Sequence, residues 1–128
     1  MRLLIDTHLL IWAAEGIERL SAEAVKLMGD QDNVLVFSAA SIWEVAIKQA
    51  LNRQDFSVDA SLLRRGLIES GYEELPIAAA HAIAVADLPG IHNDPFDRML
   101  IAQARTEGLL LLTADRRLAS YPGPIRLV

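Results

Sequence analysis

Apolar residues along this chain alternate between short continuous runs and longer stretches in which they recur every three or four positions. Short runs bounded by polar or turn residues predict strands buried on both faces, because a strand with one wet face would alternate apolar and polar residues. Such runs occupy 2–6, 34–37 and 109–113, with weaker ones at about 72–75 and 125–128. The pattern therefore predicts up to five strands separated by helical stretches.

The helical stretches begin at residues whose side chains can cap a helix. Asp94 suits the N-cap, Pro95 suits the first helical position, and Asp97 falls in the first turn, where the helix dipole favours an anion. This helix should run to Glu107 and end at Gly108. The other helices are expected at 7–15, from a cap at Ser21 to about residue 28, from Ser41 to about residue 51, from Asp59 to Gly71, and at 78–86.

Two of these helices carry more specific expectations. Ser41 and Glu44 have the spacing of a capping box, which would open a helix at Ser41 and place Glu44 in its first turn. The Ala-rich stretch 78–86 predicts a buried helix, and Trp12 and Trp43 are expected in the core rather than as platforms for bases. The apolar face of the helix after Ser41 is expected to contain Ile42, Val45, Ala46 and Leu51.

Strands that alternate with helices, and that read as continuous apolar runs, are typical of a parallel sheet covered by helices on both faces. The chain contains no internal repeat, low-complexity tract or linker. The predicted fold is therefore α/β, a three-layer α/β/α sandwich formed by one domain over residues 1–128.

Composition limits the classes of function. The 128 residues are 52% hydrophobic, yet no apolar run approaches the roughly 20 residues needed to cross a bilayer, and an acid at position 6 argues against a signal peptide. Cysteine is absent, which excludes disulfides and thiolate metal sites and is compatible with a cytoplasmic location. The net charge of −5 is opposite to that of most nucleic-acid binders, although a carboxylate metal site would itself contribute negative charge.

Four acidic residues are expected at one edge of the sheet. Asp6 ends the first strand and Asp115 follows the strand 109–113 by two residues, while Glu44 and Asp97 fall in the first turns of helices. Crossover helices run antiparallel to the strands, so helix N-termini and strand C-termini share the edge where such sheets bind ligands. Four carboxylates gathered there would repel one another unless a cation lay among them.

Each acid also has a structural explanation that the sequence alone leaves open. Glu44 could simply complete the capping box, Asp97 could balance the helix dipole, and Asp115 could cap a short helix at 116–120. Asp6 is harder to explain in this way, because an acid directly after three buried apolar residues is unusual.

The donor types favour a hard cation. Carboxylate oxygens without cysteine point to Mg²⁺ or Mn²⁺ rather than zinc, and either ion suits phosphoryl chemistry. The three histidines, His8, His81 and His92, have no zinc-like spacing. His8 and His92 could form hydrogen bonds near the site, although a structural or solvated role is the commoner one for such residues.

Four motifs follow one another along the chain: 4–12 (LIDTHLLIW), Ser38 with 41–44 (SIWE), 92–98 (HNDPFDR) and 112–115 (LTAD). Taken in order, they resemble the motifs of PIN-domain proteins, and more narrowly those of VapC-type toxins of type II toxin–antitoxin systems. The resemblance extends over nearly the whole chain, and its opening motif combined with Asp-Pro-Phe-Asp-Arg is specific.

This resemblance implies an α/β/α fold, usually a homodimer, and Mg²⁺- or Mn²⁺-dependent endoribonuclease cleavage of structured RNA such as tRNA or rRNA by a metal-activated water. It also implies a small antitoxin protein that covers the site. Asp6, Glu44 and Asp97 match the three core acids of the family, and Asp115 matches its more variable fourth. Asp6 and Asp97 are the expected direct metal ligands, with Glu44 and Asp115 either binding a second ion or holding metal-bound water.

The resemblance also implies roles for residues outside the four acids. The hydroxyl residues Thr7, Ser38 and Thr113 match positions that adjoin the metal or orient its ligands. Next to the acids in sequence, Arg98, Arg116 and Arg117 are candidates for phosphate contacts, or else solvated surface residues.

Two other functions use the same residues. A metal-dependent phosphatase or phosphotransferase would need the same acids, but an aspartate nucleophile of that kind usually has a second Asp two residues later, where this chain has His8. A non-catalytic RNA- or protein-binding module would be suggested by loss of a core acid, and none is missing.

Overall fold

The computed structural model describes residues 1–51 and 57–128, and its parallel sheet has the strand order β3-β2-β1-β4-β5. The chain therefore builds outward from β1 to β3 and then returns to the other side of β1 for β4 and β5. The strands are β1 (Arg2–Ile5), β2 (Val34–Ser38), β3 (Glu73–Leu75), β4 (Leu110–Thr113) and β5 (Ile125–Leu127).

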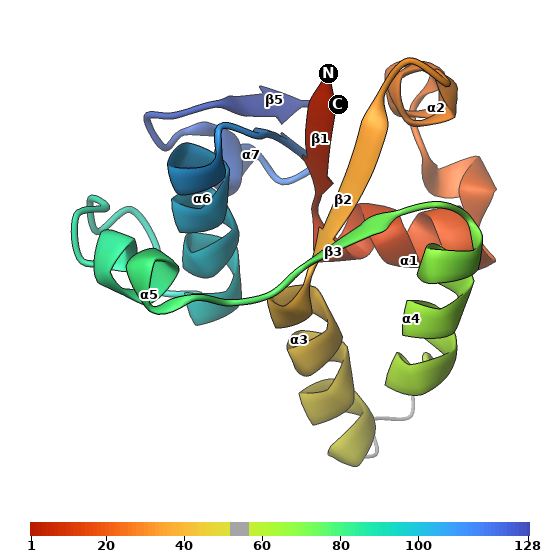
Figure 1. The fold of residues 1–128 in the computed structure, drawn as a ribbon, viewed down its shortest axis with the longest axis horizontal. Coiled ribbons are helices and arrows are strands. Elements are labelled where there is room, and N and C mark those ends of the chain that lie inside the picture. The colour runs from red at the N-terminus through yellow and green to blue at the C-terminus, as the bar shows by residue number, and fades with distance from the viewer. Residues whose placement is uncertain (52–56) are drawn as a thin grey trace.

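Helices cover both faces of this sheet (Figure 1). In that view α1, α2 and α4 lie on one side, α5, α6 and α7 lie on the other, and α3 projects beyond the edge at which β2 ends. The helices are α1 (Thr7–Glu15), α2 (Ala22–Gly29), α3 (Ala39–Ala50), α4 (Ala60–Glu69), α5 (Ala79–Val85), α6 (Pro95–Glu107) and α7 (Arg116–Ala119), with a 3-10 turn, η1, at Ile17–Arg19.

The core is divided by the sheet into two apolar clusters, because successive side chains of a strand point to opposite faces. Leu3 and Ile5 of β1 pack with α1 and α4, while Leu4 between them packs with α6. The same alternation separates Phe37 from Val36 in β2. The predicted three-layer α/β/α sandwich is confirmed. No helix in the described ranges is long and apolar enough to span a membrane.

Most element boundaries agree with the sequence prediction, but the start of α3 was predicted wrongly. The helix begins at Ala39, since Ser38 at the end of β2 already caps it: the Ala40 backbone N–H donates to Ser38 Oγ at 2.9 Å. Ser41 therefore lies inside the helix, and Glu44 lies in its second turn rather than in a capping box. Ala46 and Leu51, which were expected on the apolar face of this helix, are exposed, and Leu51 follows its last residue.

Two predictions of burial are also wrong. Helix α5 buries His81 but leaves Ile83 72% exposed. Its alanines favour a helix through their small side chains and do not indicate burial on all sides. Trp43, on the outer face of α3, is 57% exposed and packs edge-on against Phe96, with ring centroids 5.2 Å apart.

Candidate active site

The candidate site lies at the carboxyl edge of the sheet, where β1 and β4 are neighbours and the direction of strand order reverses. Ile5 pairs with Leu112 in the β1–β4 register, so the next residues, Asp6 and Thr113, adjoin. Thr113 Oγ1 donates to Asp6 Oδ2 at 2.6 Å and accepts the Asp115 backbone N–H at 3.0 Å. Parallel sheets bind ligands at such a reversal point, outside the strand ends.

Asp6 is the most deeply buried of the four acids, at 2% exposure. Its Oδ1 accepts the His8 backbone N–H at 3.3 Å, which caps α1. Burial raises the pKa of Asp6, and the Glu44 carboxylate adds to this, while the hydrogen bond from Thr113 and the charge and N–H of His8 oppose it. A cation beside this carboxyl would oppose the effect of burial and favour the ionised form.

Glu44 is brought to the same edge by the buried face of α3 and is 5% exposed. Lys48, one helical turn later, donates to Glu44 Oε2 at 3.0 Å. The other oxygen, Oε1, is buried and has no hydrogen-bond partner within the described part of the chain. A buried carboxylate oxygen without a donor is costly, and this one is free to accept a cation.

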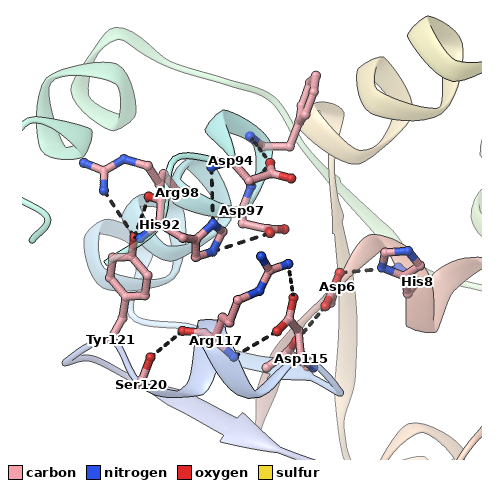
Figure 2. A network of polar contacts seen from close by, with 12 residues as sticks. Asp6, His8, His92, Asp94, Asp97, Arg98, Asp115, Arg117, Ser120 and Tyr121 are labelled. Carbon is pink, nitrogen blue, oxygen red and sulfur yellow. Dashed lines mark hydrogen bonds and ion pairs between the residues drawn. The ribbon is translucent and has the colours of Figure 1, made fainter. Parts of the chain in front are cut away.

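Asp97 lies in the first turn of α6, with its side chain 13% exposed. Burial, and after it the negative charges of Asp94, Asp6, Glu44 and Asp115 in that order, together raise the pKa of Asp97 to about 8. The four predicted acids are therefore within electrostatic range of one another. Figure 2 shows Asp6, Asp97 and Asp115 facing a common space from β1, α6 and the segment after β4.

Asp115 lies at the rim of this space. It also caps α7, which was one of the roles left open by the sequence, because its Oδ1 accepts the Arg117 backbone N–H at 2.8 Å. Partial burial acts to raise the pKa of Asp115, but hydrogen bonds from the Arg117 backbone and guanidinium and the nearby His92 bring it below its ordinary value. The contacts with Arg117 and His92 thus favour the ionised form of Asp115.

The three predicted hydroxyl residues have different neighbours. Thr113 contacts Asp6 directly, as described above. Thr7 Oγ1 donates to Ser41 Oγ at 2.8 Å and so ties α1 to α3 beneath Glu44. Ser38 uses its oxygen to cap α3. The sequence had suggested no such role for Ser41, because only the fold places it opposite Thr7.

The three arginines that were candidates for phosphate contacts also differ in their neighbours and exposure. Arg98 does not point into the acid site: its guanidinium donates to the carbonyl oxygens of Pro89 (2.8 Å) and Val85 (3.1 Å) and to the Tyr121 hydroxyl (3.2 Å). Arg117 is 70% exposed at the rim and approaches Asp115 Oδ2 at 3.5 Å. Arg116 is exposed on the same short helix.

Two contributors, Lys48 and Asp94, were not predicted as part of the site from sequence, whereas His92 was a candidate for hydrogen bonds near it. Lys48 provides the cation beside Glu44. Asp94, expected only as a helix cap, is the strongest of the charges acting on Asp97. His92 Nε2 lies 3.7 Å from Asp97 Oδ2. The spacing of Glu44 and Lys48, one turn apart on a helix, was the one sequence signal available for Lys48.

The chemistry of these donors fits a hard divalent cation. Within residues 1–51 and 57–128, no three acidic or histidine side chains form a ready-made metal-binding group. Carboxylates that repel one another are expected to stay apart in this way. The buried Glu44 Oε1, which has no donor in the described residues, and the raised pKa of Asp97 both indicate negative charge without a balancing cation. A divalent cation would remove that excess and draw the oxygens together.

Comparisons with known proteins give one consistent result. A family model described as PIN domain matches residues 3–124. Over 124 residues the chain is 32% identical to Ribonuclease VapC22 of Mycobacterium tuberculosis (strain ATCC 25618 / H37Rv), covering 94% of this chain and 92% of that protein.

Solved structures share the fold. The chain matches VapBC2 from Rickettsia felis, solved bound to a DNA fragment from its promoter, with a TM-score of 0.74 and 14% identity, covering 99% of this chain and 98% of that one. It matches FitAcB from Neisseria gonorrhoeae with a TM-score of 0.61 and 19% identity, covering 96% and 95% of the two chains. At these identities the likeness concerns the fold.

Proposed function

Because this chain belongs to the PIN domain family, we propose that it is an endoribonuclease, dependent on Mg²⁺ or Mn²⁺, and the toxin of a toxin–antitoxin pair. The observation that carries the proposal is the sheet edge at which Asp6, Asp97 and Asp115 face a common space (Figure 2), with the buried Glu44 close enough for its charge to act on Asp97. The 32% identity to a VapC ribonuclease supports RNA as the substrate.

In this proposal Asp6 and Asp97 hold the cation, and Glu44 and Asp115 hold a second ion or its water ligands. The bound cation would supply a Lewis acid that lowers the pKa of a water molecule and offsets the charge developing at the phosphorus. Thr113 fixes the rotation of the Asp6 carboxylate through its 2.6 Å hydrogen bond. Lys48 limits the negative charge that Glu44 brings to the site.

The substrate contacts are proposed at the rim. Arg117 and Arg116 extend from α7 beside Asp115, where their charges can meet the phosphates that flank the scissile bond. Arg98 is not part of this proposal, because its guanidinium is occupied by backbone carbonyls. Structured RNA such as tRNA or rRNA is the proposed substrate class.

A protein partner belongs to the same proposal. Solved relatives with this fold are VapBC assemblies, including one from Salmonella typhimurium bound to DNA. A cognate antitoxin is therefore proposed to cover the acid edge, and two copies of this chain are proposed to form a homodimer.

The test is cleavage of purified tRNA and rRNA by the wild-type protein and by Asp6→Asn and Asp97→Asn, with Mg²⁺ or Mn²⁺ and with EDTA. Cleavage is expected only with metal, in the wild type and in the matched control Asp32→Asn, which changes an exposed turn, and in neither site variant. If either site variant cleaves RNA at the wild-type rate with saturating metal, the proposed role of the acids is wrong.

A further inference from the structure

His92 lies in the segment between α5 and α6, with its side chain only 9% exposed. Its Nδ1 accepts the Asp94 backbone N–H at 3.2 Å. Its Nε2 is buried, faces Asp97 Oδ2 at 3.7 Å, and has no hydrogen-bond partner in the part of the chain that the structure describes. Figure 2 shows the ring directed toward the Asp97 carboxylate.

The hydrogen bond at Nδ1 determines where the ring proton lies. A nitrogen that accepts an N–H must carry a lone pair, so Nδ1 is unprotonated and a neutral ring carries its proton on Nε2. The Nε2–H is therefore directed at an acidic oxygen. The 3.7 Å separation exceeds the longest ordinary N–H···O distance, about 3.2 Å, by roughly half an ångström.

A second group holds the backbone of His92 in place. The Tyr121 hydroxyl donates to the His92 carbonyl oxygen and accepts its backbone N–H, both at 3.0 Å. The two rings also pack edge to face, with centroids 5.7 Å apart. Arg98 donates to the same hydroxyl, so Tyr121 joins α6 to the segment that carries His92. Tyr121 itself is buried.

This arrangement is more than core packing requires. A histidine that only filled space would need neither a fixed tautomer nor a clamped backbone, and burying its Nε2–H without an acceptor would be unfavourable. Hydrogen bonds at unliganded sites are often long and shorten when the site is loaded. A shift of about half an ångström by either side chain would bring His92 Nε2 within hydrogen-bond distance of Asp97 Oδ2.

We propose that His92, held by Tyr121, is a positioning residue that donates its Nε2–H to Asp97 Oδ2 and thereby orients the carboxylate. This leaves Oδ1 of Asp97 for a cation, and the inference rests on the proposed function to that extent. Residues that orient a ligand of a metal in this way typically change metal affinity by about 10- to 100-fold when removed.

The first experiment requires neither metal nor RNA. Two-bond ¹H–¹⁵N NMR spectra of the metal-free protein distinguish a protonated ring nitrogen from one with a lone pair. His92 is expected as the Nε2–H form. His81 is an internal reference, because its Nδ1 accepts the Ala78 backbone N–H at 2.9 Å in the same way. A His92 ring protonated at Nδ1 would overturn the proposal, whether or not the chain is a nuclease.

The second experiment measures binding of Mn²⁺ alone by calorimetry, then RNA cleavage. His92→Phe keeps an aromatic side chain but has no ring nitrogen, and it is expected to bind Mn²⁺ about 10-fold or more weakly and to lower kcat with little change in KM. His92→Gln, whose amide can accept and donate, should restore most of the affinity. Tyr121→Phe should weaken binding in the same direction.

Tyr72→Phe is the matched control, because Tyr72 packs in the other apolar cluster, and it should behave as the wild type. Wild-type Mn²⁺ affinity in a folded His92→Phe variant would refute the positioning role. A wild-type protein that binds no Mn²⁺ would instead refute the proposed metal dependence, and the tautomer of His92 would then decide this inference alone.

Discussion

Asp97→Asn should stabilise the metal-free protein while it abolishes activity. The carboxyl of Asp97 is placed where burial and four neighbouring acids oppose its ionisation, which raises its pKa to about 8. In the unfolded chain the same carboxyl ionises near its ordinary pKa of 3.8. Asparagine has nearly the same shape and cannot ionise, so the variant removes this conflict.

The magnitude follows from linkage. At pH 7 the unfolded state has lost the Asp97 proton and the folded state has largely kept it, a difference of about three pH units at about 1.4 kcal/mol each. The upper limit is therefore about 4 kcal/mol. The site edge is open to solvent and counterions, which screen the neighbouring charges, so we expect Asp97→Asn to raise the free energy of unfolding by about 2 kcal/mol.

The direction in which the free energy of unfolding changes with pH follows from the same pKa shift. A carboxyl whose pKa is raised by folding contributes full stability below the unfolded pKa and loses it as the pH rises through the folded pKa. The stability of the metal-free wild type should thus fall between about pH 4 and pH 8, with up to about 1.4 kcal/mol per pH unit due to Asp97. Asp97→Asn should show a much smaller slope.

Urea unfolding in EDTA across this range measures both quantities, and Asp32→Asn controls for the loss of a carboxylate elsewhere. With Mn²⁺ at about 100 times its Kd, the wild type should gain about 2.7 kcal/mol and the variant much less. If Asp97→Asn is no more stable than the wild type in EDTA, or keeps the wild-type pH slope, then folding does not oppose the ionisation of Asp97.

Three further changes test other parts of the molecule. Thr113→Val removes the 2.6 Å hydrogen bond to buried Asp6. The variant should have a lower kcat for RNA, and chemical denaturation should show a free energy of unfolding lower by about 1–2 kcal/mol. Arg117→Gln should weaken RNA binding without changing stability, and should reduce the slope of log Kd against log salt by about one, measured by filter binding. Gly108→Ala should cost about 1 kcal/mol of stability in urea unfolding, because residue 108 ends α6 at φ 67°.

The sequence predicted those helix ends that depend on neighbouring residues alone. The bounds of α6 are as expected, because Asp94 and Pro95 can only begin a helix there and Gly108 can only end it. The start of α3 could not be settled in this way, since Ser38 and Ser41 are both competent caps. The register of β2, which ends at Ser38, decides between them, and register is a property of the whole sheet.

The contacts within the site were harder to predict than its location. Alternating strands and helices placed the acids at one edge, but strand order was not predicted, and it is the adjacency of β1 and β4 that joins Asp6 to Thr113 across 107 positions of sequence. The exposure of Trp43 was missed for a related reason. An apolar residue on an amphipathic helix is buried only if the fold covers it, and Trp43 stays 57% exposed on α3 despite its edge-on contact with Phe96.

The distribution of charge bears on the proposal that a protein of net negative charge cleaves RNA. The chain has 17 acidic and 12 basic residues, an excess of five. Five acids surround the site when Asp94 is included with the four predicted ones, as the charges that act on Asp97 demonstrate. Because Lys48, Arg116 and Arg117 lie at the same edge, the remainder of the chain has a formal charge of −3 and the site with its rim has a formal charge of −2. Divalent ions there would offset most of that field, leaving Arg116 and Arg117 to attract phosphate.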